Sequence, residues 1–131
     1  MVKMIAGLLV LLFIVFGCAT EKRRNAIHDT LRLYEKTLRW GAYREAQTLK
    51  LEVRKPLPEG LNEIKVTSYE IVSQSVTEDA DQLEQTVEIK FYHEQQGMIK
   101  TLMDRQTWVY DDKLDGWFLE SELPDFMSAI Q

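Results

Sequence analysis

Apolar residues follow a helical period in the first part of the chain. Within residues 26–39 they recur every three or four positions, which is the spacing of one buried face of an α-helix. These positions are Ile27, Leu31, Tyr34 and Leu38. Trp40-Gly41 interrupts the pattern, and residues 42–51 are predicted to form a second, shorter helix. Two prolines and a glycine within residues 54–60 then exclude a regular helix.

The apolar period changes to two after this break, which predicts β-strands. The predicted strands are residues 63–77, 83–92, 98–110 and a segment that begins at Trp117. A phase shift in the first strand predicts a β-bulge, and apolar residues on both sides of the third predict a central position. Asp115-Gly116 is a hairpin turn signal, and Phe126, Met127 and Ile130 are expected to pack the C-terminal tail. The chain is therefore predicted to be α+β, with N-terminal helices on a curved four-stranded antiparallel meander.

The first 17 residues differ in composition from the rest of the chain. They contain 14 apolar residues and one charge, Lys3. The apolar run from Met4 to Phe16 would reach about 20 Å as a helix, short of the roughly 30 Å hydrocarbon core of a bilayer. Residues 1–17 are therefore predicted to be a secretory signal, with an uncleaved helical anchor as the alternative.

The end of this run resembles the lipobox of bacterial lipoproteins. Val15, Gly17 and Cys18 match the aliphatic, small and cysteine positions of that motif, and Phe16 departs from it because a small residue is usual there. The resemblance implies that the thiol of Cys18 is acylated and that Cys18 becomes the first residue of the mature chain. Such acyl chains would hold a soluble domain at a membrane almost permanently.

The residues after the cysteine bear on location. Ala19 stands where these lipoproteins carry an aspartate for inner-membrane retention, so the resemblance implies the periplasmic face of the outer membrane. Residues 18–25 are expected to be the lipidated cysteine and a short tether, followed by a single domain over residues 26–131. The basic run 22–24 is expected either to touch lipid phosphates or to form the solvated start of a helix.

Two further segments resemble nuclear-transport-factor-2-like domains, in the wider cystatin-like group. Residues 34–46, with Trp40-Gly41-Ala42-Tyr43 at the centre, are similar to the junction of their first two helices. Residues 107–119 are similar to their last, tryptophan-containing hairpin, although many members have three helices where two are predicted here. The resemblance implies a cavity between helices and sheet that serves ligand binding, catalysis or dimerisation. The candidate cavity-lining residues are Trp40, Tyr43, Trp108 and Tyr110.

The candidate chemistry is sparse. His28 and His93 have no paired spacing, so no metal site and no cofactor are predicted, and nucleophile-elbow and phosphate-binding glycine motifs are absent from the sequence. Asp104 is the one weak catalytic candidate, because it shares a predicted strand face with Trp108. On a cavity wall it would be a perturbed general base; the alternative is a carboxylate on an exposed strand edge or one paired with a neighbour such as Lys90 or Arg105.

Charge restricts the choice of partners. The formal net charge is −5, and loss of Lys3 with the N-terminal segment leaves −6, which argues against nucleic acid. Residues 18–55 carry +5 and residues 56–131 carry −11, which either lets the helical part face anionic lipid or reflects only the differently solvated faces of helices and strands. We expect a non-catalytic, lipid-anchored envelope protein that binds a protein partner or a small apolar ligand. The alternatives are a small isomerase- or hydrolase-like enzyme and a structural homodimer through the open sheet face.

Overall fold

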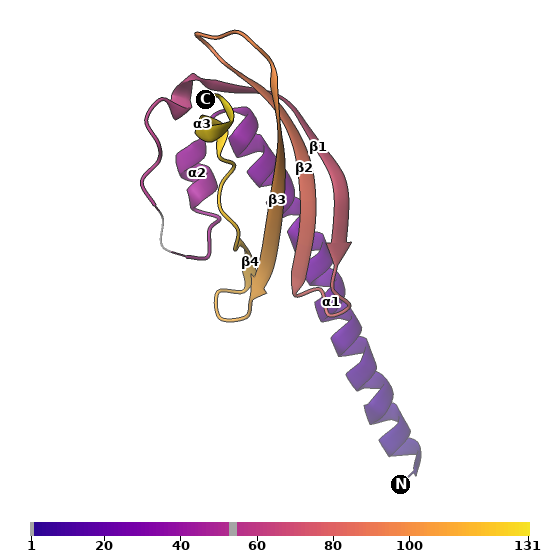
Figure 1. The fold of residues 1–131 in the computed structure, drawn as a ribbon. Helices are drawn as coiled ribbons and strands as arrows, with labels where there is room; N and C mark the ends of the chain where they lie inside the picture. Colours follow the sequence, from indigo (N-terminus) through magenta and orange to yellow (C-terminus); the bar gives the residue numbers. More distant parts are fainter. Residues whose placement is uncertain (1, 53–54) are drawn as a thin grey trace.

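The chain folds as one helix laid across a four-stranded antiparallel sheet (Figure 1). A computed structural model describes residues 2–52 and 55–131, with side chains described from residue 18 onward. The helices are α1 (Val2–Arg39), α2 (Tyr43–Gln47) and α3 (Phe126–Ala129), with a 3-10 turn at Leu61–Glu63. The strands are β1 (Ile64–Val76), β2 (Gln82–His93), β3 (Lys100–Asp111) and β4 (Gly116–Leu119). They lie side by side in chain order, so the predicted α+β meander is confirmed.

The sheet confirms two finer predictions. β3 lies between β2 and β4 and is therefore a central strand. β1 shifts register against β2 twice, between Val66 and Ser68 and between Ile71 and Ser73, where the sequence indicated one bulge. These irregularities bend the edge strand, which is the usual effect of an extra residue in a ladder.

The helices differ from the prediction at both ends. Residues 20–25 continue α1, so the expected tether is a helix in the structure. α2 ends at Gln47, although a helix was predicted to residue 51. The reason is backbone pairing: the Leu119 N–H donates to the Leu49 carbonyl at 2.7 Å, and the Leu51 N–H donates to the Leu119 carbonyl at 3.0 Å. The segment after α2 thus satisfies the free edge of β4 instead of extending the helix.

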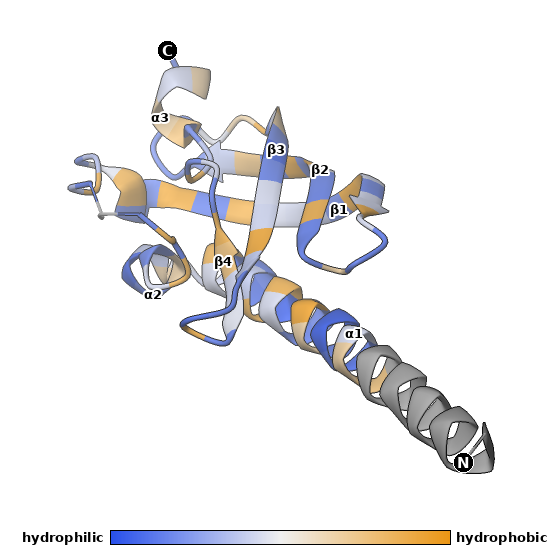
Figure 2. Ribbon diagram, turned by 90° about the horizontal axis from the view of Figure 1, so that it is seen from below, coloured by the Kyte–Doolittle hydropathy of each residue, from blue (hydrophilic) through white to orange (hydrophobic). Residues whose placement is uncertain are grey.

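The core lies between α1 and the inner face of the sheet. The predicted apolar stripe of α1 is buried, and burial alternates strictly along the middle of β2. Tyr34 packs edge-on against Trp108 with ring centroids 5.1 Å apart. Figure 2 shows the mixture of hydrophobic and hydrophilic residues along α1 and the strands that this one-sided burial requires. Ile99 and Met103, on the other side of the chain from this core, are about half exposed. The predicted homodimer through the open sheet face stays a prediction.

Residues 2–17 of the predicted signal segment, and Cys18, lie in the first half of helix α1. In the part of the chain that the structure describes, no helix is both long and apolar enough to cross a bilayer. The side chains of residues 1–17, where a signal peptide is predicted, lie outside those described. Cys18 is the first residue whose side chain is described, and its thiol is exposed.

Candidate functional site

A row of amide side chains crosses the inner face of the sheet. The Gln74 Nε2 donates to Gln85 Oε1 at 2.9 Å, and the Gln85 Nε2 donates to Gln106 Oε1 at 2.8 Å. The Gln106 Nε2 donates to Asp104 Oδ2 at 2.8 Å and to the Tyr69 hydroxyl at 2.9 Å. The strand register creates the row, because Gln74 lies opposite Gln85 and Gln85 lies opposite Gln106.

Asp104 lies at the buried end of this row. Its side chain is only 7% exposed, and burial raises its pKa from 3.8 to about 6 against the opposing effect of the Gln106 hydrogen bond. Lys90 pairs with Glu88 at 4.0 Å, so the alternative of a surface ion pair between Asp104 and Lys90 does not describe the structure. Asp104 is thus a buried carboxyl group that titrates close to neutral pH.

Two tyrosines share this environment. The Tyr34 hydroxyl is fully buried and has no hydrogen-bond partner among the described residues. Burial, together with the nearby Asp104 carboxyl, raises the pKa of both Tyr34 and Tyr69, so both hydroxyls stay protonated. The wall of the apolar groove and the walls of the depressions beside β1 and α1 do not include Asp104. Asp104 therefore lies off these walls, although its partner Gln106 lines the depression beside β1.

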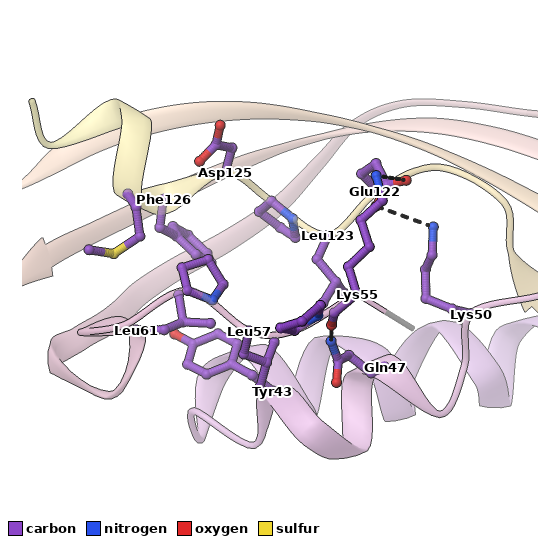
Figure 3. A pocket seen from close by; sticks show the side chains of 14 residues that line it. Tyr43, Gln47, Lys50, Lys55, Leu57, Leu61, Glu122, Leu123, Asp125 and Phe126 are labelled. Carbon is purple, nitrogen blue, oxygen red and sulfur yellow. Dashed lines mark hydrogen bonds and ion pairs between the residues drawn. The ribbon is translucent and has the colours of Figure 1, made fainter. Parts of the chain in front are cut away.

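An apolar groove lies between α2, residues 55–61 and residues 122–127 (Figure 3). Its volume is about 250 Å³, and it is open along one side. Its apolar lining residues are Tyr43, Pro56, Leu57, Pro58, Leu61, Leu123, Pro124, Phe126 and Met127. All three prolines of the chain are among them, so much of the wall has a fixed backbone φ and lacks N–H donors.

Three charged side chains stand at one end of this groove. Glu122 accepts from Lys50 at 3.6 Å and from Lys55 at 3.4 Å. The Lys50 side chain is 6% exposed and also donates to the Ser121 carbonyl at 2.7 Å, whereas Lys55 is 79% exposed. The Gln47 amide donates to the Lys55 carbonyl at 2.6 Å and ties α2 to the loop. The site therefore combines an apolar floor with one polar end, where the exposed ion pair of Lys55 can be replaced by other partners.

The four predicted cavity residues do not come together. Tyr43 is buried and lines the groove. Trp40 is 80% exposed, because it follows the last residue of α1 and Gly41, with φ +69°, turns the chain there. Trp108 is fully buried in the core, and Tyr110 packs against Trp117 with centroids 5.7 Å apart at the other end of β3. Of these four residues, Tyr43 alone lines the groove.

Sequence reasoning missed most of the groove. The sequence pattern indicates only a break at residues 54–60, and only tail packing by Phe126 and Met127. The available signal was the distribution of proline, since Pro56, Pro58 and Pro124 flank apolar residues in two segments without a regular period. Such segments give no periodicity from which mutual contact could be inferred.

Metal binding receives no support in the described residues. No group of three His, Cys, Asp or Glu side chains in residues 18–52 and 55–131 is arranged to hold an ion. His28 is exposed on α1, and the His93 Nε2 lies 2.8 Å from Glu63 Oε2.

No protein-family model matches the chain, and no curated protein or solved structure matches it. The α+β arrangement is compatible with the nuclear-transport-factor-2-like resemblance, since one helix covers an open antiparallel meander. Membership of that family stays a prediction.

Proposed function

We propose that this is a lipid-anchored protein of the bacterial cell envelope that binds an extended apolar segment of a partner protein. Acylated Cys18 would hold it on the periplasmic face of the outer membrane. The observation that carries the binding role is the apolar groove between α2, residues 55–61 and residues 122–127. The lipobox-like order of Val15, Gly17 and Cys18 supports the anchor.

The dimensions of the groove favour a peptide segment over a free small molecule. Pockets for drug-sized ligands enclose roughly 300–1,000 Å³ and bury most of the ligand. A groove of about 250 Å³ that is open along one side suits one or two apolar side chains of a larger partner. The exposed Lys55–Glu122 ion pair, with Glu122 63% exposed, can rearrange to meet polar groups of that partner at little cost.

The position of the groove supports the same partner. α2 and α3, which form its walls, lie at the end of the molecule away from the N-terminus (Figure 1). An anchor at Cys18 would therefore leave the groove facing the periplasm rather than the bilayer. A soluble or membrane-bound envelope protein could reach it there.

Site-specific photocrosslinking in intact cells tests the binding role. A photoreactive residue at Leu57, in the groove, should crosslink to a partner protein, and Leu123→Asp in the same chain should remove the crosslink. Leu33, which is 51% exposed on α1, is the matched control position. Equal crosslinking at Leu57 and Leu33 would overturn the proposal, and a ligand retained in native mass spectra without a protein crosslink would indicate a small molecule instead.

Fractionation tests the anchor separately, since Cys18→Ala should move the protein out of the membrane fraction.

A second candidate function rests on Asp104. Burial raises the pKa of its carboxyl group to about 6, and the nearby Tyr34 hydroxyl has no hydrogen-bond partner in the described part of the chain, which is an arrangement suited to proton transfer. In that case Asp104 would be the general base of a small isomerase- or hydrolase-like enzyme. Asp104→Asn discriminates the two roles, because it should leave the Leu57 crosslink unchanged in a binding protein.

A further inference from the structure

Helix α1, which contains Cys18, is clamped to the hairpin between β3 and β4. The Arg23 guanidinium stands 4.5 Å from the ring centroid of Tyr110 and 3.1 Å from Asp112 Oδ1. The Trp117 indole N–H donates to the Arg23 carbonyl at 2.9 Å. Arg23 lies five positions after Cys18 in this helix, which is about 8 Å along the axis at 1.5 Å per residue. A short rigid helix therefore connects the anchor to the domain, in place of a flexible tether.

The meander brings two turns to this same end. The β1–β2 turn and the β3–β4 turn lie where α1 leaves the domain, whereas the β2–β3 turn lies at the opposite end (Figure 1). A shallow depression joins α1 to both turns, and its lining residues include Ala19, Arg23, Asp79, Asp81 and Asp112. An acylated Cys18 would therefore hold both turns beside the lipid headgroups.

The acidic groups of the β3–β4 turn have partners within the domain, although Asp112 and Asp115 are themselves exposed, the Asp112 side chain to 83%. Asp111 Oδ1 accepts from the Leu114 N–H at 2.8 Å, Asp112 pairs with Arg23, and Asp115 accepts from the Tyr110 hydroxyl. Lys113 and Leu114 remain at the tip, and Leu114 is 63% exposed. A single exposed leucine is ordinary on a soluble surface, but this one stands beside the residue that would carry the acyl chains.

We propose that the β3–β4 turn is a membrane-contacting surface whose tip, Lys113 and Leu114, rests on the phospholipid bilayer that holds Cys18. The inference rests on the acylation of Cys18 in the proposed function. Contact follows from the rigid connection, which keeps the tip at a high local concentration next to the headgroups. Glu78, Asp79 and Asp81 on the neighbouring turn offset the basic groups, so anionic lipid is not required. The surface sets the orientation of the domain and points the groove away from the membrane.

A polarity-sensitive fluorophore on the lipidated full chain tests this surface. Leu114→Cys provides one labelling site, because Cys18 would be blocked by its acyl chain. Met98→Cys is the matched control, since Met98 is 65% exposed on the β2–β3 turn at the opposite end. In phosphatidylcholine vesicles that contain headgroup nitroxide lipids, we expect blue-shifted emission and several-fold stronger quenching at position 114 than at position 98. Added phosphatidylglycerol should not increase this difference.

Two further measurements separate the possible failures. Vesicle flotation of the unlabelled wild-type protein and of Cys18→Ala reports the anchor alone; a wild-type protein that does not float overturns acylation and the inference with it. If the protein floats but positions 114 and 98 are quenched equally, only the orientation is overturned. A Gly-Ser linker inserted between Ala19 and Thr20 should keep flotation and remove the extra quenching at position 114. Unchanged quenching with the linker would also overturn the role assigned to the rigid helix.

Discussion

The row of polar side chains on the inner face of the sheet and the apolar groove beside α2 differ in the chemistry of their residues and in their exposure to solvent. Asp104 and Gln106 are 7% and 1% exposed, and their hydrogen bonds are made within the sheet. The groove, in contrast, has an apolar floor that is open to solvent. Asp104 thus lines neither the groove nor the depressions described above, whereas Gln85 and Gln106 reach the depression beside β1.

This difference shows why a perturbed carboxyl group is weak evidence for catalysis on its own. A buried carboxyl group acquires a raised pKa wherever a polar network crosses a core. The groove, in contrast, leaves space against an apolar wall at the margin of the core, so it is the better indicator of binding. The comparison predicts that substitutions in the row act on stability, whereas substitutions in the groove act on binding.

Removal of the centre of the row should have the largest effect. Gln106→Leu would remove the side-chain partner of Asp104, Tyr69 and the Trp108 indole N–H and one of the two partners of Gln85, and each buried group left unsatisfied costs about 1–3 kcal/mol. We expect a loss of about 3–4 kcal/mol in the free energy of unfolding, measured by urea denaturation. Gln74→Leu is the control, because Gln74 is at the exposed end of the row and makes one of its bonds. An equal loss in both variants would show that the row does not act as a buried network.

Asp104→Asn should have the next largest effect, and this effect depends on pH. The folded domain binds the Asp104 proton more tightly than the unfolded chain, because the pKa rises from 3.8 to about 6. The contribution of Asp104 to the free energy of unfolding therefore falls as pH rises through this interval. We expect the stability of Asp104→Asn relative to wild type to increase by at most about 3 kcal/mol between about pH 4 and pH 7, measured by urea denaturation at several pH values.

Asp125→Asn provides a control of opposite sign for this titration. Hydrogen bonds from Ser128 lower the pKa of Asp125, so its contribution to stability is present above its unfolded pKa and is lost as pH falls. The stability of Asp125→Asn relative to wild type should therefore decrease as pH rises. A flat difference for Asp104→Asn would show that its carboxyl group titrates normally in the fold.

The fold was largely predictable from the sequence because its elements are periodic. The four-residue spacing around Leu31 and Tyr34 marked α1, and the alternation around Val87 and Ile89 marked β2. The shared face of Asp104 and Gln106 also follows from the period of two. Their contact with Gln74 and Gln85 does not, because it depends on a register that two irregularities in β1 determine.

The groove was not predictable because its walls have no period. Residues 55–61 and 122–127 are irregular segments far apart in the sequence, and each is compatible with many partners. Trp40 illustrates the same limit on a smaller scale. The large apolar ring of a tryptophan favours a buried position. The turn at Gly41 nevertheless directs Trp40 to solvent.

Tyr34→Phe should have a smaller effect, and one that stabilises the domain. The Tyr34 hydroxyl is buried without a partner in the described part of the chain, and burial of such a group costs about 1–3 kcal/mol. Its removal keeps the ring contact with Trp108, so we expect a gain of about 1 kcal/mol in thermal or urea unfolding. Tyr43→Phe is the control, because the Tyr43 hydroxyl already donates to the Ile64 carbonyl, at 3.4 Å. A loss of stability in Tyr34→Phe would mean that the hydroxyl has a partner, such as an ordered water.

Lys55→Ala should have the smallest effect on stability. Lys55 and Glu122 are 79% and 63% exposed, and ion pairs of this kind contribute about 0–1 kcal/mol. Glu122 also keeps its pair with the buried Lys50, so the polar end of the groove survives the substitution. We expect less than about 0.5 kcal/mol of change in urea unfolding, together with a weaker photocrosslink at Leu57 if Lys55 meets polar groups of the partner. A destabilisation as large as that of Gln106→Leu would contradict the division between a row that holds the fold and a groove that is free to bind.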